Sequence, residues 1–115
     1  MNDLKLWIDD VRPAPEGYVW LKSTNEAINF LKQYMIFTNH VIVNMRELQT
    51  FPKIELINID HDAGDYTSDG GDYIKVLEYL EYMCFGCPIH IHSMNPVGVA
   101  NMKVIIQKNG WKEVF

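Results

Sequence analysis

The 115-residue chain is 48% hydrophobic and 22% charged, values that predict one globular domain over residues 1–115 and exclude disordered, collagen-like and low-complexity sequences. The 10 lysines and arginines against 15 aspartates and glutamates give a net charge of −5, so we expect no non-specific binding to nucleic acid. The sequence has no apolar run near the roughly 20 residues of a membrane helix, no signal-peptide core and only two cysteines, so we expect a cytoplasmic protein without membrane contact.

The first predicted elements are two short strands separated by a loop. Residues 4–8 predict a strand that stops at Asp9 and Asp10. Residues 12–17 predict a loop, because two prolines and a glycine do not continue a helix or a ladder. Residues 18–22 are rich in aromatic and branched side chains, which is typical of a second strand.

A helix follows and leads into the least regular part of the sequence. Ser23 and Glu26 have the spacing of a capping box, which predicts the start of a helix. Residues 36–55 fit no single pattern, since residues 41–43 favour a strand and residues 45–48 favour a helix. Both alternatives stay open for this segment.

The second half of the chain repeats the alternation of strand and helix. Residues 56–60 predict an apolar strand that ends at an aspartate, and residues 61–72 predict a polar loop. Residues 73–84 carry apolar side chains at helical spacing. Residues 89–92 predict a further strand.

The last predicted elements are a helix and a strand. Asn95 and Pro96 are typical of a helix start, because asparagine caps the first turn and proline is tolerated within it. Gly110 indicates the end of this helix. Residues 111–115 predict a final strand.

Strands that alternate with helices predict an α/β fold with a mainly parallel sheet. In such sheets the ligand site lies beyond the carboxyl ends of the strands. Three predicted strands end in acidic or imidazole side chains, which we therefore expect at one edge: Asp9, Asp10, Asp60, His61, Asp62 and His92.

Several carboxylates at one edge need a counter-charge, because like charges at close range do not all stay ionised. A divalent cation meets this need, and aspartate oxygens suit Mg²⁺ or Mn²⁺. A histidine ligand shifts the preference toward manganese, iron or zinc. The competing interpretation is that some of these aspartates are turn residues or helix caps.

Two further side chains at this edge have alternative interpretations. Arg12 follows the paired aspartates and is suited either to gripping a phosphate or to a salt bridge with Asp9 or Asp10. His92 precedes a predicted helix start and is suited to acid–base chemistry or metal ligation, with simple packing as the alternative.

Three blocks of the sequence resemble the signature motifs of the cyclic-phosphate-processing receiver domain family: residues 6–15, 59–64 and 89–98. The resemblance implies a flavodoxin-like, receiver-like three-layer sandwich with a mainly parallel central sheet. It also implies an active site built from the Asp-Asp, Asp-His-Asp and His-Ser-x-Asn-Pro motifs. The sequence departs from the pattern at Ala63, where leucine is expected, and in the length of residues 36–55.

With this resemblance, the first hypothesis is a metal-dependent phosphoesterase that acts on a cyclic phosphate or a related phosphate ester. A cation, magnesium or manganese, is expected on Asp9, Asp10 and Asp60. Catalytic roles are expected for Asp60, His61, Asp62 and His92, with the histidines exchanging protons and Asp62 either orienting His92 or acting as a further ligand. Contacts to the small phosphate-ester ligand are expected from Arg12, Ser93 and Asn95.

Two other hypotheses belong to different functional classes. The family is similar to receivers of two-component signalling, so the chain would be a module that holds metal and phosphate, with phosphorylation at Asp60. Those receivers use a lysine after the last strand, and here the lysines at positions 103, 108 and 112 fall in the predicted last helix and strand. The third hypothesis is a catalytically silent interaction domain.

Overall fold

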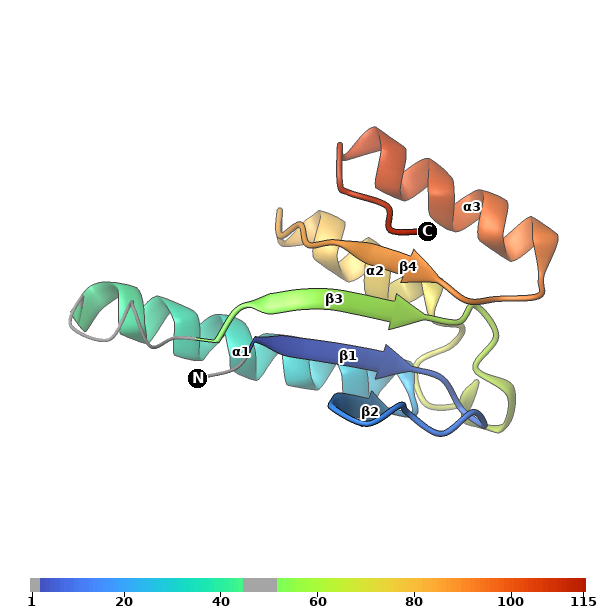
Figure 1. The fold of residues 1–115 in the computed structure, drawn as a ribbon, viewed down its shortest axis with the longest axis horizontal. Helices are drawn as coiled ribbons and strands as arrows, with labels where there is room; N and C mark the ends of the chain where they lie inside the picture. Colours follow the sequence, from blue (N-terminus) through green and yellow to red (C-terminus); the bar gives the residue numbers. More distant parts are fainter. Residues whose placement is uncertain (1–2, 45–51) are drawn as a thin grey trace.

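The computed structural model describes residues 3–44 and 52–115. Figure 1 shows a sheet whose strands all point in the same direction, with helices packed behind it. The strand order is β2-β1-β3-β4 and every pairing is parallel. The elements in chain order are β1 (Leu4–Ile8), β2 (Tyr18–Leu21), α1 (Thr24–Asn44), β3 (Ile54–Ile59), the 3₁₀ helix η2 (Gly64–Tyr66), α2 (Ile74–Tyr82), β4 (Ile89–Ile91) and α3 (Pro96–Lys108).

The register of the sheet brings the strand ends together. Ile8 pairs with Leu21 on one side and with Ile59 on the other, and Ile59 pairs with Ile91. The residues that follow these strands therefore leave the sheet at one edge, as the sequence predicts. The predicted α/β fold with a parallel sheet is confirmed.

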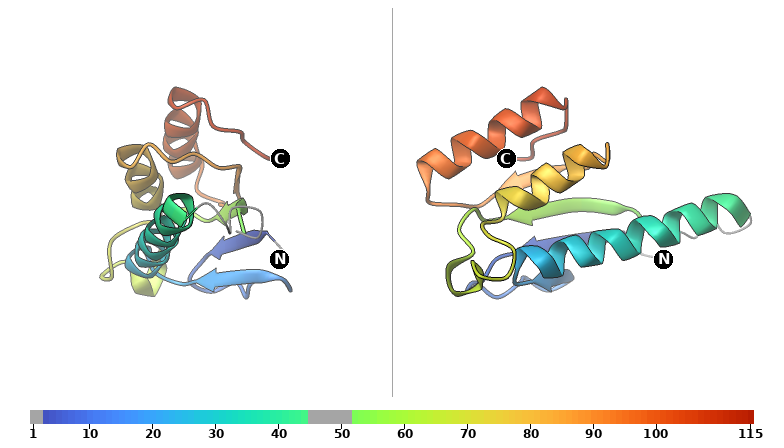
Figure 2. Two further views of the ribbon diagram at one scale, coloured as in Figure 1. Left: turned by 90° about the vertical axis from the view of Figure 1, so that its left-hand side faces the viewer. Right: turned by 180° about the vertical axis from the view of Figure 1, so that it is seen from behind.

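The hydrophobic core lies on the face of the sheet that α1, α2 and α3 cover, and Figure 2 shows all three helices on this side. Connections between parallel strands are right-handed, and the connections that contain these helices all run in the same direction across the sheet. The core side chains come from both layers and are fully buried: Leu6, Ile8, Ile57, Ile59, Leu31, Leu77, Leu80 and Met102.

The opposite face of the sheet carries no helix within the described residues. The connection from β1 to β2 runs the other way across the sheet, so a helix in it would cover this face. Residues 9–17 form a loop instead, as their prolines predict. The receiver-like α/β class is thus confirmed, while the described residues build two of the three expected layers.

Two ambiguous or predicted strands have other structures. Residues 41–43 belong to α1, which continues to Asn44, because extending an existing helix costs less than starting a new element. Residues 45–48, the other alternative in this segment, lie outside the described residues. The strand predicted at residues 111–115 is reduced to a single parallel bridge between Glu113 and Ile89.

The helix predicted over residues 73–84 is shorter than expected. Helix α2 ends at Tyr82, and Cys84 has a positive φ of 54° that a helix cannot contain. The start of α3 agrees with the prediction, since Asn95 caps the helix and Pro96 begins it. None of the described helices has both the length and the apolar character needed to cross a membrane.

Candidate metal and phosphate site

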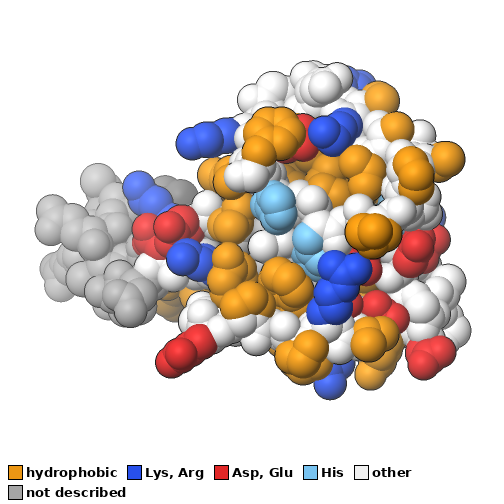
Figure 3. Space-filling model, turned by 45° about the vertical axis from the view of Figure 1, so that its right-hand side comes forward, with side chains coloured by type: hydrophobic (Ala, Val, Ile, Leu, Met, Phe, Trp, Pro, Cys, Tyr) orange, Lys and Arg blue, Asp and Glu red, His pale blue; other side chains and the backbone are white. Residues whose placement is uncertain are grey.

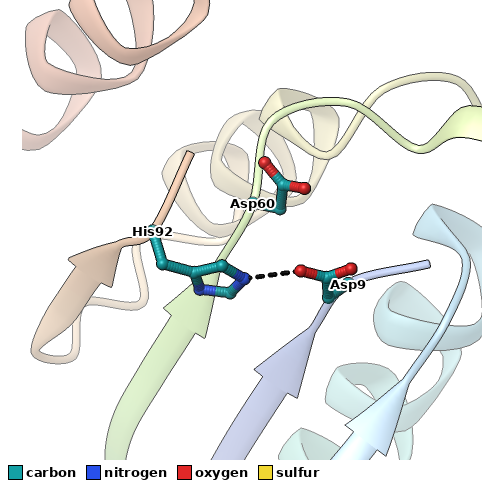
Figure 4. Close-up of side chains that lie close together, drawn as sticks. All are labelled: Asp9, Asp60 and His92. Atoms are coloured by element: carbon teal, nitrogen blue, oxygen red, sulfur yellow. Dashed lines mark hydrogen bonds and ion pairs between the residues drawn. The ribbon is translucent and has the colours of Figure 1, made fainter. Parts of the chain in front are cut away.

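Asp9, Asp60 and His92 meet at the carboxyl edge of the sheet and are called the edge cluster here. Each offers one ligand atom, and these atoms lie within 4.8 Å of one another. Figure 4 shows the three side chains near the ends of β1, β3 and β4, with the imidazole of His92 facing the carboxylate of Asp9. The sequence predicted this convergence from the strand ends.

Asp9 is almost completely buried, with 1% of its side chain exposed. Its Oδ1 accepts hydrogen bonds from the amides of Val11 at 2.9 Å and Arg12 at 3.0 Å, and its Oδ2 lies 2.8 Å from His92 Nε2. Burial acts to raise the pKa of Asp9, but these amides and His92 hold it below its ordinary value. Asp9 is therefore held as a carboxylate.

His92 is 10% exposed and contacts a partner through each ring nitrogen. Nδ1 hydrogen-bonds Asn58 Oδ1 and Nε2 faces Asp9. Burial lowers the pKa of His92, and the nearby Asp9 carboxylate opposes that effect. The ring stacks on Trp7, with centroids 4.1 Å apart and planes 8° apart, so its orientation is fixed.

Asp60 belongs to the cluster, and Asp10 lies beside it. Asp60 Oδ1 accepts the amide of His61 at 2.7 Å. Burial, together with the charges of Asp9 and Asp60, raises the pKa of Asp10. Asp10 packs against Gly64, where a Cβ would lie 2.1 Å from Asp10 Oδ2. Three carboxylates are thus concentrated in a small space.

Arg12 supplies positive charge at this edge. Its Nε lies 4.0 Å from Asp9 Oδ2, and its guanidinium donates to the carbonyl oxygen of His92 at 3.2 Å. The salt bridge to Asp9 agrees with one of the two predicted interpretations, while 51% of the side chain stays exposed for a ligand. A guanidinium at 4.0 Å balances little of the charge of three carboxylates, and oxygen ligands with one imidazole suit a divalent cation.

A second group of possible ligands lies in the loop after β3 and consists of His61, Asp62 and Asp72. His61 Nδ1 lies 2.7 Å from Asp62 Oδ1, and His61 and Asn95 lower the pKa of Asp62. Asp62 therefore contacts His61 and not, as one expectation had it, His92. Asp72 Oδ1 accepts the amide of Ala63 at 3.1 Å.

Ser93 and Asn95 hold the loop between β4 and α3. Asn95 Oδ1 accepts the amide of Gly98 at 3.0 Å, and its Nδ2 donates to Asp62 Oδ1 at 3.1 Å. Ser93 Oγ accepts the amide of Asn95 at 3.2 Å. The amide group of Asn95 is thus engaged at both atoms, whereas Ser93 contacts only its own loop in the described contacts.

Three residues of the site were not predicted from the sequence. Asn58 and Trp7 contact His92, and Trp20 donates from Nε1 to the carbonyl oxygen of Asp9 at 2.8 Å. Asn58 and Trp7 each lie two residues before a strand-end aspartate, on the same face of the sheet. The sequence held one signal for Asn58, because it is a lone polar residue in an otherwise apolar strand.

The model of the cyclic-phosphate processing receiver domain matches residues 4–108, nearly the whole chain. The chain belongs to this family. No curated protein and no solved structure matches this receiver domain. The predicted family is confirmed, and the receiver domain carries acidic clusters of the kind that bind divalent metals.

The surface of the receiver domain near the site mixes polar and apolar groups. Figure 3 shows histidine side chains at the centre of this face, surrounded by hydrophobic side chains and with lysine or arginine beside them. Two exposed hydrophobic residues, Val11 and Met94, come from the loops at the strand ends, and Val97 comes from the first turn of α3.

Proposed function

We propose that this receiver domain is a divalent-cation-dependent phosphoesterase that opens a cyclic phosphate ester by the addition of water. The observation that carries the proposal is the edge cluster itself, in which two carboxylates and an imidazole share a space of 4.8 Å. The family's name supports the same substrate class. The His61–Asp62 pair on the adjoining loop supplies acid–base chemistry.

The cation would be held by Asp9, Asp60 and His92, with Asp10 beside them. A bound Mg²⁺ or Mn²⁺ supplies polarisation of a phosphoryl oxygen and a lowered pKa for a bound water. Asp9 suits this role because its carboxylate is kept ionised by the amides of Val11 and Arg12.

His61 is the group to which we assign proton transfer. Asp62 contacts Nδ1 at 2.7 Å, which favours a proton on Nδ1 and leaves Nε2 as the base, by the logic of a His–Asp pair. Nε2 would take a proton from the attacking water while a phosphorus–oxygen bond forms and a ring phosphorus–oxygen bond breaks. The same proton then passes to the leaving oxygen, so that the products are a phosphomonoester and a free hydroxyl.

His92 and Arg12 have different roles in this proposal. Both ring nitrogens of His92 face fixed partners, which suits a ligand better than the proton exchange expected from the sequence. The half-exposed guanidinium of Arg12 would bind the phosphate of the substrate. Ser93 and Asn95 contribute by holding the loop that carries the carbonyl group bonded to Arg12.

The test is hydrolysis of 2′,3′-cyclic nucleotides and other cyclic phosphate esters with added Mn²⁺ or Mg²⁺, followed by ³¹P NMR. Wild type is expected to form a phosphomonoester. His61→Gln is expected to lower kcat by at least about 100-fold, the range of a lost general base. Asp60→Asn is expected to lower kcat as well, because it removes a carboxylate ligand of the cation.

Two control variants distinguish the loss of a site residue from the effect of any substitution in the same part of the chain. Asp65→Asn changes an exposed acid in the loop that carries His61, and His90→Gln changes a histidine on β4 that contacts Val114. Both are expected to keep wild-type activity. Absence of turnover across the whole panel with each metal would contradict the proposal.

One observation favours a signalling module as the alternative. Asp60 follows β3 and lies within the electrostatic reach of Asp10, which is the arrangement of a phospho-accepting aspartate beside acidic metal ligands. Against it, Lys103 and Lys108 are paired with Glu113 and Glu81. A stable beryllofluoride adduct at Asp60 without turnover would favour the module over the esterase.

A further inference from the structure

His92 is enclosed by side chains from two neighbouring strands. Nδ1 meets Asn58 Oδ1 from β3, and one face of the ring lies on the indole of Trp7 from β1. Only Nε2 points toward the edge of the sheet, where Asp9 lies at 2.8 Å and Asp60 completes the cluster (Figure 4). The environment of the ring thus distinguishes its two nitrogens.

The sheet register produces this enclosure. Trp7 pairs with Asn58, and Asn58 pairs with His90, so these side chains form a row on the face that no described helix covers. His92 follows His90 by two residues and its ring lies over this row. Trp7 is itself fixed, because its Nε1 donates to the carbonyl oxygen of Arg12 at 2.8 Å and Tyr18 packs edge-on at 5.9 Å.

The hydrogen bond to Asn58 decides where the proton of a neutral His92 lies. A neutral imidazole has one N–H and one lone pair, and the amide oxygen of Asn58 accepts the N–H of Nδ1. Nε2 faces Asp9 Oδ2 at 2.8 Å, and this contact is a hydrogen bond while Nε2 carries a proton. A cation that displaces this proton would find the lone pair of Nε2 and the carboxylate oxygen side by side.

We propose that Asn58 is a positioning residue, which fixes the Nδ1–H form of His92 so that Nε2 is available as a ligand at the edge cluster, while Trp7 holds the plane of the ring. The metal role of His92 rests on the proposed function. The proton position does not, because Asn58 imposes it with or without a metal. Outer partners of this kind change metal affinity by about 10- to 100-fold.

The test compares two replacements of similar size to asparagine. Asn58→Leu removes the acceptor, and Asn58→Asp keeps an acceptor for Nδ1. The first readout is the ¹⁵N spectrum of metal-free protein at pH 8, and the second is Mn²⁺ affinity by calorimetry. Thermal melting of each variant establishes that it is folded.

Wild type and Asn58→Asp are expected to show His92 protonated at Nδ1. Asn58→Leu is expected to shift the ring toward the Nε2–H form that a free histidine side chain prefers, and to bind Mn²⁺ about 10- to 100-fold more weakly. Asn58→Asp is expected to bind Mn²⁺ at least as tightly as wild type.

A wild-type spectrum with a proton on Nε2 and none on Nδ1 would overturn the proposal, because Asn58 would then be donating through its amino group. Unchanged proton position in Asn58→Leu would overturn it as well. If the spectra agree with the expectation but no phosphate ester is hydrolysed, the proposed function fails and the positioning role stands. If esters are hydrolysed while Asn58→Leu keeps the wild-type spectrum and Mn²⁺ affinity, only the positioning role fails.

Discussion

At the scale of single residues, two glycines mark where the backbone approaches the site. A Cβ on Gly64 would lie 2.1 Å from Asp10 Oδ2, and a Cβ on Gly98 would lie 2.4 Å from the ring of His61. Gly98 is inside α3 and has no positive φ, so its conformation alone would accept alanine. The side chain of His61 is therefore what requires glycine at this position.

This contact reverses the usual effect of a glycine-to-alanine replacement in a helix on the free energy of unfolding. Glycine to alanine within a helix normally stabilises by about 0.5–1 kcal/mol, but Gly98→Ala is expected to lower the free energy of unfolding by about 1–3 kcal/mol through overpacking. Urea denaturation measures the change. Ala100→Gly, at an exposed position of the same helix, is the control and is expected to cost about 0.5–1 kcal/mol. A gain in stability for Gly98→Ala would show that the ring has room to move.

The lowered pKa of Asp9 predicts how stability depends on pH. Because the folded pKa lies below the ordinary value of 3.8, the unfolded chain takes up the proton first as pH falls. The stabilising contribution is complete above 3.8 and is lost as pH falls from there through the folded pKa.

Metal-free protein is therefore expected to lose stability over this acidic range, and Asp9→Asn is expected to show a shallower loss. Denaturant titrations between pH 6 and pH 2.5 measure the slope, with Asp65→Asn as the matched variant. An identical slope in wild type and Asp9→Asn would contradict the assignment of this shift to Asp9.

At the scale of elements, β3 separates the core from the open face of the sheet. Ile57 is fully buried against the helices, whereas Leu56 lies on the opposite face and is half-buried. Successive side chains of a strand point to opposite faces. Replacing Ile57 therefore removes contacts in the core, whereas replacing Leu56 removes contacts on the open face of the sheet.

Replacing these two residues tests the layer arrangement. Ile57→Ala is expected to cost about 2–5 kcal/mol, as for a buried branched side chain, and Leu56→Ala is expected to cost less than half as much. Chemical denaturation of both variants gives the comparison. Equal losses would indicate that both faces of β3 are covered in solution.

The sequence predicts the elements of this domain better than it predicts their contacts. Asp9, Asp60 and His92 were expected together because parallel strands end at one edge, and this follows from alternating patterns alone. The contacts of Asn58 and Trp7 with His92 depend on the register between strands, which no local pattern encodes.

Two segments differ from their local strand preference because of the structure around them. Residues 41–43 are β-branched and favour a strand locally, but they continue α1. Residues 111–115 have the composition of a strand, yet only Glu113 forms a bridge to β4. In both places the neighbouring structure outweighs the local preference.

At the scale of the whole molecule, the fold places one core and one site at different positions of the sheet. The helices cover one face and bury the apolar side chains, while the carboxyl edge collects the acids and imidazoles. Stability and chemistry therefore depend on separate sets of residues, apart from the few glycines and hydrogen bonds that join them.

We expect Asp9, Asp60 and His92 to share one cation. A crystal structure of the protein soaked in Mn²⁺, with diffraction data collected at the manganese absorption edge, tests this expectation most directly. The expected result is an anomalous peak within bonding distance of one ligand atom from each of the three side chains. A peak on His61, Asp62 and Asp72 instead, or no peak at the carboxyl edge of the sheet at saturating Mn²⁺, would contradict it.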